Sequence, residues 1–299
     1  MVQAAIVQQK LQNLYPQLLI NILGISTSGD EILDQPLNKI GGKGLFVSEL
    51  ETLLLDGAAD IAVHSMKDVP ATLADGLVLG AIMQRANPCD VFVSNKYSSL
   101  QQLPAAAVVG TSSLRRQAQV LALRSELVIM PLRGNVETRL EKLTSGEYDA
   151  IILAAAGLER LGLLQCLDKP LNITEMLPAV GQGALGIEYN ASRDDIQKLL
   201  APLNHPISAA CVLAERAMNA KLDGGCQAPI AGFAEIHEST LTLQGLVANP
   251  NGKTIFKATY SGNIRDAALI GETVAIRLLE QGAGSIISEL KNMWQKDAW

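Results

Sequence analysis

The sequence lacks several features that would place the protein in common classes. Its 299 residues carry 24 lysines and arginines against 30 aspartates and glutamates, so the formal net charge is −6. This acidic balance disfavours broad binding to nucleic acid or to an anionic membrane surface. The longest apolar run, near 150–158, is far shorter than the ~20 residues that span a bilayer. Any anion-binding site must therefore be a local concentration of cations.

Paired cysteines and clustered histidines are also absent. The four cysteines, Cys89, Cys166, Cys211 and Cys226, form no Cys-x-x-Cys pair, and the three histidines are scattered along the chain. Neither a structural zinc site nor a disulfide framework is indicated. The first ten residues lack the basic start and the cleavage site of a signal peptide. We therefore expect a cytoplasmic protein that holds no metal ion.

What is present is the pattern of an α/β protein. The predicted strands of the first 153 residues are 18–25, 60–63, 77–83, 90–94, 108–110, 127–130 and 149–153, and the predicted helices are 2–14, 45–55, 114–123 and 136–144. This alternation predicts βαβ units and mainly parallel sheets. The first helix should bury Ala5, Ile6, Leu11 and Leu14. A polar stretch with four glycines, 26–44, predicts a long mobile loop.

The chain divides into two α/β lobes and a third part. Composition shifts near 85–88 and 181–186, which suggests that the chain crosses between two lobes and back. From residue 206 on, a long helix is followed by alternating patterns near 230–236, 240–247 and 254–261, and then by helices. These patterns predict a small α+β domain with an antiparallel sheet. The long helix should bury Ile207, Ala210, Cys211, Ala214, Ala217 and Met218.

A short strand at 60–63 leads into polar residues at its carboxyl end. Lys67 and Asp68 stand just past this end, and Val69-Pro70 stops the element. Ligands in open α/β sheets bind beyond the carboxyl ends of strands, so this pair is a candidate site. Taken alone, a surface ion pair of little energetic value is the better interpretation. His64, just before it, is better explained as a hydrogen-bonded strand residue than as a base.

Arginines concentrate in the middle of this acidic chain. Between 111 and 139 there are five arginines against two acidic residues, and Arg115 and Arg116 stand in the first turn of a predicted helix. Positive charge there opposes the helix dipole, which makes sense if an anion binds at that turn. The alternative is a solvated basic face. We favour an anion site, because these cations lie at strand-to-helix junctions and several arginines suit a ligand with several carboxylates.

Three glycine-containing segments require separate interpretations. Cys226 lies in a glycine-flanked loop after the long helix, where it is either a reactive thiol or a small buried side chain. The segment 41–44 carries Lys43 but lacks the spacing of a phosphate-binding P-loop. The segment 181–186 matches G-x-G-x-x-G, yet a strand-like stretch follows where a dinucleotide site needs a helix. We interpret it as a hinge with close backbone approach.

Five motifs together resemble one family. They are His64-Ser-Met-Lys-Asp-Val-Pro70, Val109-Gly-Thr-Ser-Ser-Leu-Arg-Arg116, Leu132-Arg-Gly-Asn135, Leu177-Pro-Ala-Val-Gly-Gln-Gly183 and Gly224-Gly-Cys-Gln-Ala-Pro229. In family order and over nearly the whole chain, they resemble the hydroxymethylbilane synthase family, also called porphobilinogen deaminases. The resemblance implies two lobes of the type II periplasmic-binding-protein kind, 1–84 plus 184–202 and 89–180, and a C-terminal domain, 206–299.

The resemblance also implies a reaction and a cofactor. A monomer would condense four porphobilinogens, with loss of ammonia, on a dipyrromethane cofactor bound covalently to Cys226. Asp68 would be the catalytic carboxylate, facing the pyrrole N–H groups and stabilising the cation left when ammonia departs. The implied cofactor-binding residues are Lys67, Thr111, Ser112, Ser113, Arg115 and Arg116. The implied substrate-binding residues are Lys43, Ser65, Arg133, Gly134, Asn135, Arg139, Arg160 and Gln182, with the 26–44 loop as a lid.

The start of the chain departs from the family pattern. Relatives begin with a strand ending in an Arg-x-Ser type motif, whereas this chain starts inside the helix that follows that strand. A parallel sheet without such a strand would leave buried backbone groups unpaired. If Met1 is the true start, we expect low stability and weak or no activity. A full deaminase rate from this chain would contradict that expectation.

Two other classes of function compete with this interpretation. A non-catalytic two-lobed protein that binds a polycarboxylate would need the arginines but not Cys226. An intact mass that shows a dipyrrole adduct on the thiol distinguishes the two. A DNA-binding regulator with a two-lobed effector domain is disfavoured, because no basic helix-turn-helix segment is present.

Overall fold

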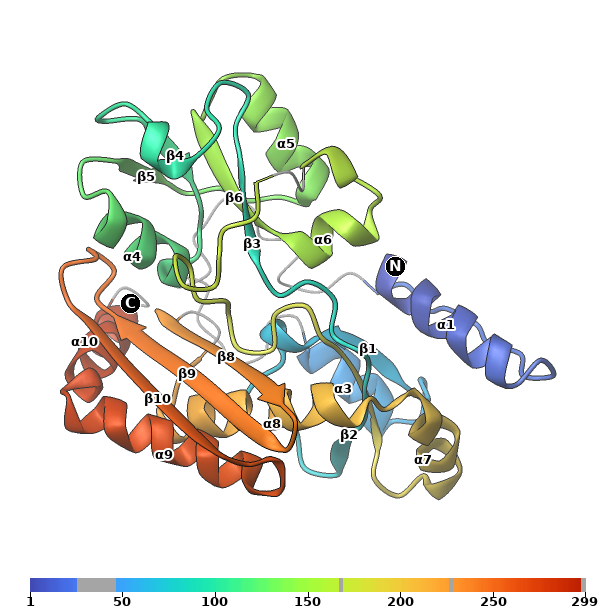
Figure 1. The fold of residues 1–299 in the computed structure, drawn as a ribbon. Helices are drawn as coiled ribbons and strands as arrows, with labels where there is room; N and C mark the ends of the chain where they lie inside the picture. Colours follow the sequence, from blue (N-terminus) through green and yellow to red (C-terminus); the bar gives the residue numbers. More distant parts are fainter. Residues whose placement is uncertain (26–46, 167–168, 226–227, 297–299) are drawn as a thin grey trace.

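Three sheets organise the part of the chain that the computed structural model describes (Figure 1). The described residues are 1–25, 47–166, 169–225 and 228–296. The predicted 26–44 loop, Lys43 and Cys226 lie outside them. Each sheet forms because its strands carry apolar residues that helices cover. The segments near 85–88 and 178–184 connect the first two sheets, and the third sheet begins at Ile230.

The first sheet has the strand order β1 (Ala62–Ser65), β7 (Leu185–Asn190) and β2 (Leu77–Ile82). Strand β7 returns late in the chain and pairs antiparallel with both neighbours. Helix α1 (Val2–Leu14) packs on one face and α3 (Ser48–Leu55) on the other. Strand β7 is buried along most of its length, because it is the central strand and both faces are covered. His64 is indeed hydrogen-bonded, with its Nε2 2.9 Å from Glu188 Oε2.

The second sheet has the order β3 (Asp90–Val93), β6 (Ala150–Ala154), β4 (Val108–Gly110) and β5 (Val128–Met130). Strand β4 is parallel to β5 and β6, and β3 is antiparallel to β6. Helices α4 (Leu114–Leu123), α5 (Val136–Thr144) and α6 (Ala155–Arg160) accompany it. Ser113 and Asn135 accept backbone N–H bonds from Arg116 and Thr138 and so cap α4 and α5. The site residues that follow β4 and β5 therefore stand at two helix starts.

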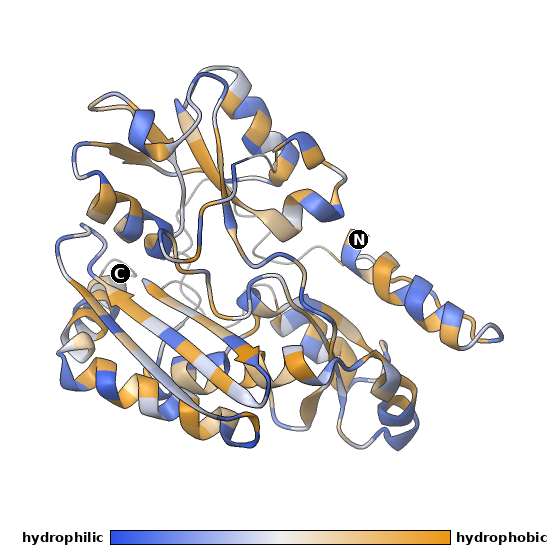
Figure 2. Cartoon of the chain, in the orientation of Figure 1, coloured by the Kyte–Doolittle hydropathy of each residue, from blue (hydrophilic) through white to orange (hydrophobic). Residues whose placement is uncertain are grey.

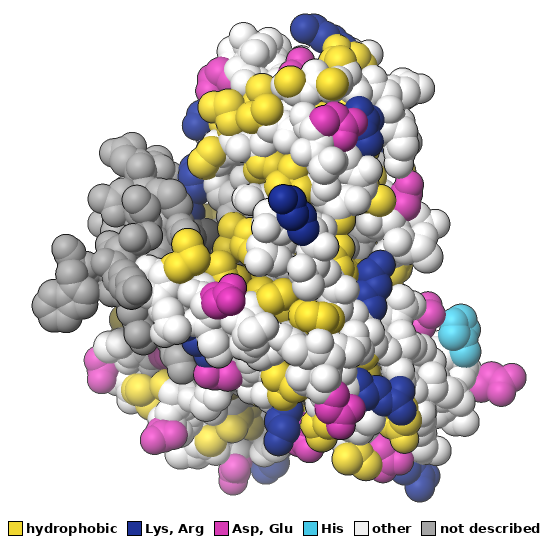
Figure 3. Space-filling model, turned by 90° about the vertical axis from the view of Figure 1, so that its left-hand side faces the viewer, with side chains coloured by type: hydrophobic (Ala, Val, Ile, Leu, Met, Phe, Trp, Pro, Cys, Tyr) yellow, Lys and Arg dark blue, Asp and Glu magenta, His cyan; other side chains and the backbone are white. Residues whose placement is uncertain are grey.

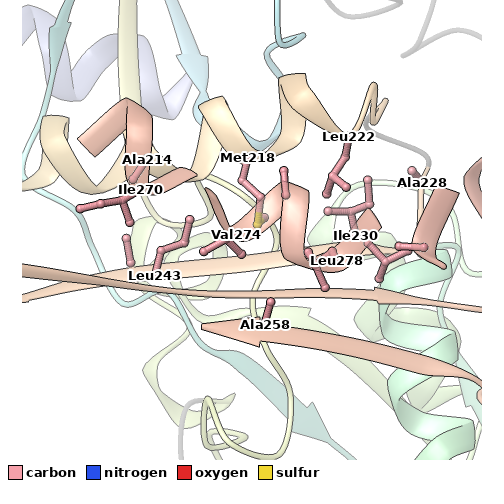
Figure 4. Close-up of a cluster of buried hydrophobic side chains, with 14 of the residues drawn as sticks. Ala214, Met218, Leu222, Ala228, Ile230, Leu243, Ala258, Ile270, Val274 and Leu278 are labelled. Carbon is pink, nitrogen blue, oxygen red and sulfur yellow. The ribbon is translucent and has the colours of Figure 1, made fainter. Parts of the chain in front are cut away.

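The third sheet is antiparallel, with the order β10 (Ile255–Asn263), β9 (Thr240–Ala248) and β8 (Ile230–His237). Helices α8 (Pro206–Lys221) and α9 (Ala267–Glu280) pack on one face, and α10 (Ala283–Lys296) follows. Hydrophobic and hydrophilic residues alternate along its strands in Figure 2. Met218, Val274 and Leu278 fill the space between helices and sheet (Figure 4). Full burial of a side chain such as Leu278 contributes roughly 1.5–3 kcal/mol.

The remaining described elements are short. They are α7 (Asp194–Leu200) and the 3-10 turns η1 (Met66–Asp68), η2 (Leu100–Gln102), η3 (Leu164–Cys166), η4 (Ala201–Leu203) and η5 (Ile264–Asp266). Among the described residues, no helix combines the length and apolar character that crossing a membrane requires. On the face drawn in Figure 3, the described basic side chains are interspersed with acidic ones.

The α/β class with a C-terminal antiparallel sheet is confirmed, and several details differ from the sequence prediction. The predicted strand at 18–25 is wrong, because this segment pairs with no described strand and leaves Leu19 94% exposed. The first helix buries Val7 and Leu11, whereas Ala5 and Leu14 are exposed. Helix α6 was not predicted, because its alanines continue the apolar run of β6. Among the described strand pairs, only those of β4 with β5 and β6 in the second sheet are parallel. In the first sheet, β7 runs antiparallel to both β1 and β2.

Candidate active site

The turn after β1 carries Lys67 and Asp68. Strand β1 ends at Ser65, and η1 is held by Met66 N donating to Ala184 O at 3.0 Å and by Val69 N donating to Met66 O at 3.4 Å. Pro70 then prevents a helix from continuing, because proline has no N–H. The Lys67 and Asp68 side chains therefore stand beyond the carboxyl end of β1, as the sequence predicted.

The glycine-rich segment 181–186 packs against this turn. A Cβ on Gly181 would lie 2.8 Å from the Cβ of buried Met66, and a Cβ on Gly186 would overlap the Met66 sulfur. A Cβ on Gly183 would lie 2.7 Å from Ala86 O. Gly181 and Gly183 also have positive φ angles, 72° and 89°. The interpretation of this motif as a point of close backbone approach is confirmed, and it lies where the two crossing segments touch.

Arg115 and Arg116 bind a carboxylate that the sequence interpretation overlooked. Arg115 Nη1 donates to Asp90 Oδ2 at 2.7 Å, and Arg116 Nη2 donates to Asp90 Oδ1 at 2.7 Å. Arg115 also donates to Leu177 O and Arg116 to Ile152 O, both at 2.8 Å. All three charged side chains are buried. The carboxylate of Asp90 thus supplies negative charge to the two arginines at the start of α4. Binding of the cofactor by these arginines stays a prediction.

Asp90 is the centre of a buried group of hydrogen-bonded side chains. Burial alone would raise the pKa of Asp90, but Arg115 and Arg116 together hold that pKa below its ordinary value. Gln182 Nε2 also donates to Asp90 Oδ1 at 3.0 Å and to Pro88 O at 2.7 Å. The signal in the sequence was the pair of arginines against the helix dipole, which needs a nearby carboxylate. Asp90, 25 residues earlier, looked like an ordinary strand residue.

Lys67, Arg133, Arg139 and Arg160 are the remaining basic side chains of the predicted site. Burial lowers the pKa of Lys67 from its ordinary value of 10.5, with further lowering by Arg116 and Arg115 and partial opposition from Asp68 and Asp90. Burial also lowers the pKa of Arg139 to about 10, and Arg116 and Arg133 lower it further while Asp68 raises it. The charge of Asp68, after the first sheet, therefore acts on Arg139, after the second.

Arg133 and Arg160 lie at the margins of this group. Burial lowers the pKa of each guanidinium group. Arg160 Nη2 donates to Gly183 O at 2.8 Å, which places it against the crossing segment, whereas Arg139 Nε donates to Gly134 O at 2.7 Å. Glu159 partly opposes the decrease at Arg160. Partly buried cations favour an anionic ligand, because such a ligand offsets the cost of burying the charge.

The small polar residues expected to bind ligands all have local partners in the structure. Thr111 Oγ1 accepts from Ser113 N at 3.2 Å, and Ser112 Oγ bridges the backbone O and N of Leu132 at 3.0 Å each. Ser65 Oγ accepts from Gln3 Nε2 at 2.8 Å. These bonds fix the loops after β1, β4 and β5. The ligand roles of Ser65, Thr111, Ser112, Ser113, Gly134 and Asn135 stay predictions.

The loop that contains Cys226 is described only at its two flanks. Helix α8 ends at Lys221, and Gly224 N donates to Asn219 O at 3.0 Å while Asn219 Nδ2 donates back to Gly224 O at 3.1 Å. On the other side, Ala228 N donates to Gly225 O at 3.0 Å before β8 begins. Both ends are thus attached to the third sheet and α8. Among the described residues, no cluster of His, Cys, Asp and Glu could hold a metal ion.

Two family models match the chain. Residues 1–198 match the dipyrromethane cofactor binding domain of porphobilinogen deaminase, and residues 209–280 match the C-terminal domain of porphobilinogen deaminase. The porphobilinogen deaminase of Chromobacterium violaceum is 56% identical over 96% of this chain and 93% of that protein. The porphobilinogen deaminase of Laribacter hongkongensis is 54% identical over 97% of this chain and 94% of that protein.

A solved structure gives a much weaker similarity. The periplasmic substrate-binding protein of an ABC transporter from Coxiella burnetii is 16% identical, with a TM-score of 0.43 over 71% of this chain and 90% of that one. No conclusion rests on this agreement. The two curated relatives and the two family models carry the assignment.

Proposed function

The chain belongs to the porphobilinogen deaminase family, and we propose that the group around Lys67 and Asp68 is its active site. The protein is a transferase, hydroxymethylbilane synthase, which condenses four porphobilinogen molecules with loss of ammonia into a linear tetrapyrrole. The electrostatic coupling of Asp68 with Arg139 supports the proposed location, because it joins the first sheet to the cations of the second.

The residues present fit the dipyrromethane cofactor of the family. Its two pyrrole rings carry carboxylates, and the described side chains supply partly buried cations at two helix starts. When bound, the dipyrromethane supplies the pyrrole carbon to which the first substrate unit is joined. We assign its attachment to the Cys226 thiol, and its carboxylates to Lys67, Arg115 and Arg116 with the hydroxyl groups of 111–113.

In this proposal, a neighbouring set of residues binds the carboxylates of the substrate. Porphobilinogen carries an acetate and a propionate, and an arginine binds a carboxylate through two parallel N–H bonds. Arg133 and Arg139 are suited to this because burial makes their positive charge costly, and a bound carboxylate offsets that cost. The further members of the proposed substrate set are Lys43, Ser65, Gly134, Asn135, Arg160 and Gln182.

Asp68 is the acid–base group of the proposed site. Its carboxylate is exposed on η1, next to the half-buried Lys67, so its oxygens can accept the pyrrole N–H groups of a bound substrate. As the aminomethyl nitrogen leaves as ammonia, positive charge develops on the substrate, and a carboxylate oxygen of Asp68 stabilises it. The same oxygen accepts the proton that is lost from the pyrrole carbon when the new C–C bond forms.

The experiment is an assay of ammonia release from porphobilinogen, with intact mass measured on the same sample. We expect the wild type to carry a dipyrrole adduct and Asp68→Asn to release ammonia at least ~100-fold more slowly, because it loses the acid–base group. Asp56→Asn, on the exposed end of α3, is the control and should keep the wild-type rate. An unmodified chain that binds a polycarboxylate without releasing ammonia would instead support the two-lobed binding protein.

The domain organisation and setting complete the proposal. We assign 1–84 plus 184–202 and 89–180 to two lobes around the first and second sheets, and 206–299 to a domain around the third sheet. We also propose a cytoplasmic monomer that binds no nucleic acid. The free thiols of Cys89 and Cys211 suit a reducing compartment. Analytical ultracentrifugation tests the monomer, with a concentration-independent mass near 31.8 kDa as the expected result.

A further inference from the structure

An arginine on α8, the helix that packs on the third sheet, contacts the segment directly after Asp68. Arg216 lies on α8, and its guanidinium group donates to three successive carbonyl groups. Nη1 bonds Val69 O at 3.3 Å, and Nη2 bonds Pro70 O at 2.9 Å and Ala71 O at 3.1 Å. These are the three residues that directly follow Asp68, and the Arg216 group is partly buried against them.

We propose that Arg216 is a positioning residue for Asp68. The turn itself has little internal support, because the Val69 N to Met66 O bond is long at 3.4 Å and Pro70 has no N–H to donate. Its carbonyl groups therefore need donors from elsewhere in the molecule. Arg216 supplies them as a charged donor with a planar fork, which restrains the direction in which the chain leaves Asp68. This inference rests on the proposed role of Asp68.

Helix α8 is well placed to provide such a restraint, because the preceding residue anchors it. Glu215 is fully buried and accepts from Arg85 Nη1 at 2.6 Å, from Gly181 N at 2.7 Å and from Ala234 N at 2.8 Å. The helix turn at 215–216 is thus tied to both crossing segments and to β8. Gly181 packs in turn against Met66, so both sides of the Asp68 turn are positioned relative to the same part of α8.

This arrangement also connects the two reacting parts of the molecule. Helix α8 ends five residues before Cys226, and its Arg216 contacts the segment that follows Asp68. The proposed attachment point of the cofactor therefore follows α8 in the chain, and the proposed catalytic carboxylate lies next to a segment that α8 contacts. Removing the contact should misplace the carboxylate while leaving the carboxylate-binding cations of the second sheet intact. A loss in kcat larger than any change in KM is the expected result.

Arg124, which follows α4 beside the second sheet, offers a matched control. Arg124 also donates to three backbone carbonyl groups of one turn, those of Leu100 at 2.9 Å, Gln101 at 2.8 Å and Leu103 at 2.8 Å. That turn carries none of the proposed site residues. Arg216→Met and Arg124→Met therefore remove the same kind of contact and keep an apolar stem. Only the first should affect the position of Asp68.

The kinetic experiment compares these two variants in the full chain. We expect Arg216→Met to lower kcat roughly 10- to 100-fold, because a small misplacement of a reacting group has an effect of this size. Arg124→Met should keep kcat, and Arg216→Lys should recover part of the rate by donating to one or two of the carbonyl groups. In an Asp68→Asn background, Arg216→Met should cause little further loss, since the group that it positions is already gone.

A second readout needs no activity. Amide hydrogen exchange of peptides that cover 62–71, followed by mass spectrometry, should become faster in Arg216→Met and stay unchanged in Arg124→Met. Unchanged exchange in Arg216→Met, or a rate loss that simply multiplies with that of Asp68→Asn, overturns the positioning role. A wild type without the dipyrrole adduct would refute the proposed function instead, and the exchange result would still decide whether Arg216 holds the turn.

Discussion

Two pairs of basic side chains, Arg115 with Arg116 and Lys67 with Arg139, differ in how their charge is balanced. Arg115 and Arg116 share the buried carboxylate of Asp90, whose pKa they hold below its ordinary value. For Lys67 and Arg139, burial lowers the pKa and neighbouring cations lower it further, while Asp68 only partly opposes the decrease. The first group is balanced by the protein itself and orients helix α4. The second favours an anionic ligand, and the following variants test this contrast.

The largest effect should come from removing the shared carboxylate. Asp90→Asn leaves two buried arginines without a counter-charge, which should lower the free energy of unfolding by about 3–5 kcal/mol. Urea unfolding followed by circular dichroism measures this. Asp195→Asn, which removes one of the two exposed carboxylates paired with Arg193, is the control and should leave the urea midpoint unchanged. Equal midpoints for the two variants would mean that Asp90 is not a structural anchor.

A smaller effect, on binding rather than stability, is expected in the second group. Arg139→Met should raise KM for porphobilinogen roughly 10- to 100-fold, because a charged hydrogen bond to a carboxylate contributes about 1.5–3 kcal/mol. Its urea midpoint should fall much less than that of Asp90→Asn, since relief of the repulsion with Arg116 and Arg133 offsets the loss of the hydrogen bond to Gly134 O. Arg277→Met, on the outer side of α9, should leave KM unchanged. A stability loss like that of Asp90→Asn would erase the distinction between the two groups.

The smallest effect is a shift in pH dependence. The folded pKa of Lys67 is lowered, so its charge is lost, and KM should rise, at a pH below 10.5. The free energy of unfolding should increase over the same pH range. Below the folded pKa the protein bears the cost of burying the charged Lys67, and this cost disappears as pH rises toward the unfolded pKa. Lys67→Arg should move the alkaline rise in KM to higher pH, because the guanidinium group stays charged.

Asp90 should give the opposite pH signature. Its folded pKa is lowered, so its contribution to stability is complete above the unfolded pKa of about 3.9 and is lost as pH falls through the folded pKa. Acid unfolding of the wild type should therefore be steeper below about pH 4 than that of Asp90→Asn. Parallel acid profiles would contradict the assignment of Asp90 as a charged anchor.

Local signals in the sequence carried much of the fold. The helix at 136–144 and the strand at 108–110 were predicted within their observed limits, because their caps and apolar periods lie within a few residues. The 18–25 segment was predicted wrongly, since an apolar period does not show whether a partner strand is available. Among site residues, Lys67, Asp68, Arg133 and Arg139 were found from their positions after strands or at helix starts. Their ligand roles stay predictions.

Asp90 and Arg216 were missed for a different reason. Each acts through partners that are distant in the sequence: Asp90 through arginines 25 and 26 residues away, and Arg216 through carbonyl groups about 146 residues away. No periodicity or local motif reports such a pairing. The buried acid Glu215 on the apolar side of α8 was missed in the same way.

The sequence by itself determined the family, the α/β class and the strand-end positions of Lys67 and Asp68, because these depend on local periods, caps and an ordered set of motifs. Only the tertiary structure decided which arginines share a buried carboxylate of the protein, namely Arg115 and Arg116. It also decided that α8 holds the Asp68 turn. Charge balance and burial depend on distances between remote segments, and those distances exist only once the sheets have been brought together.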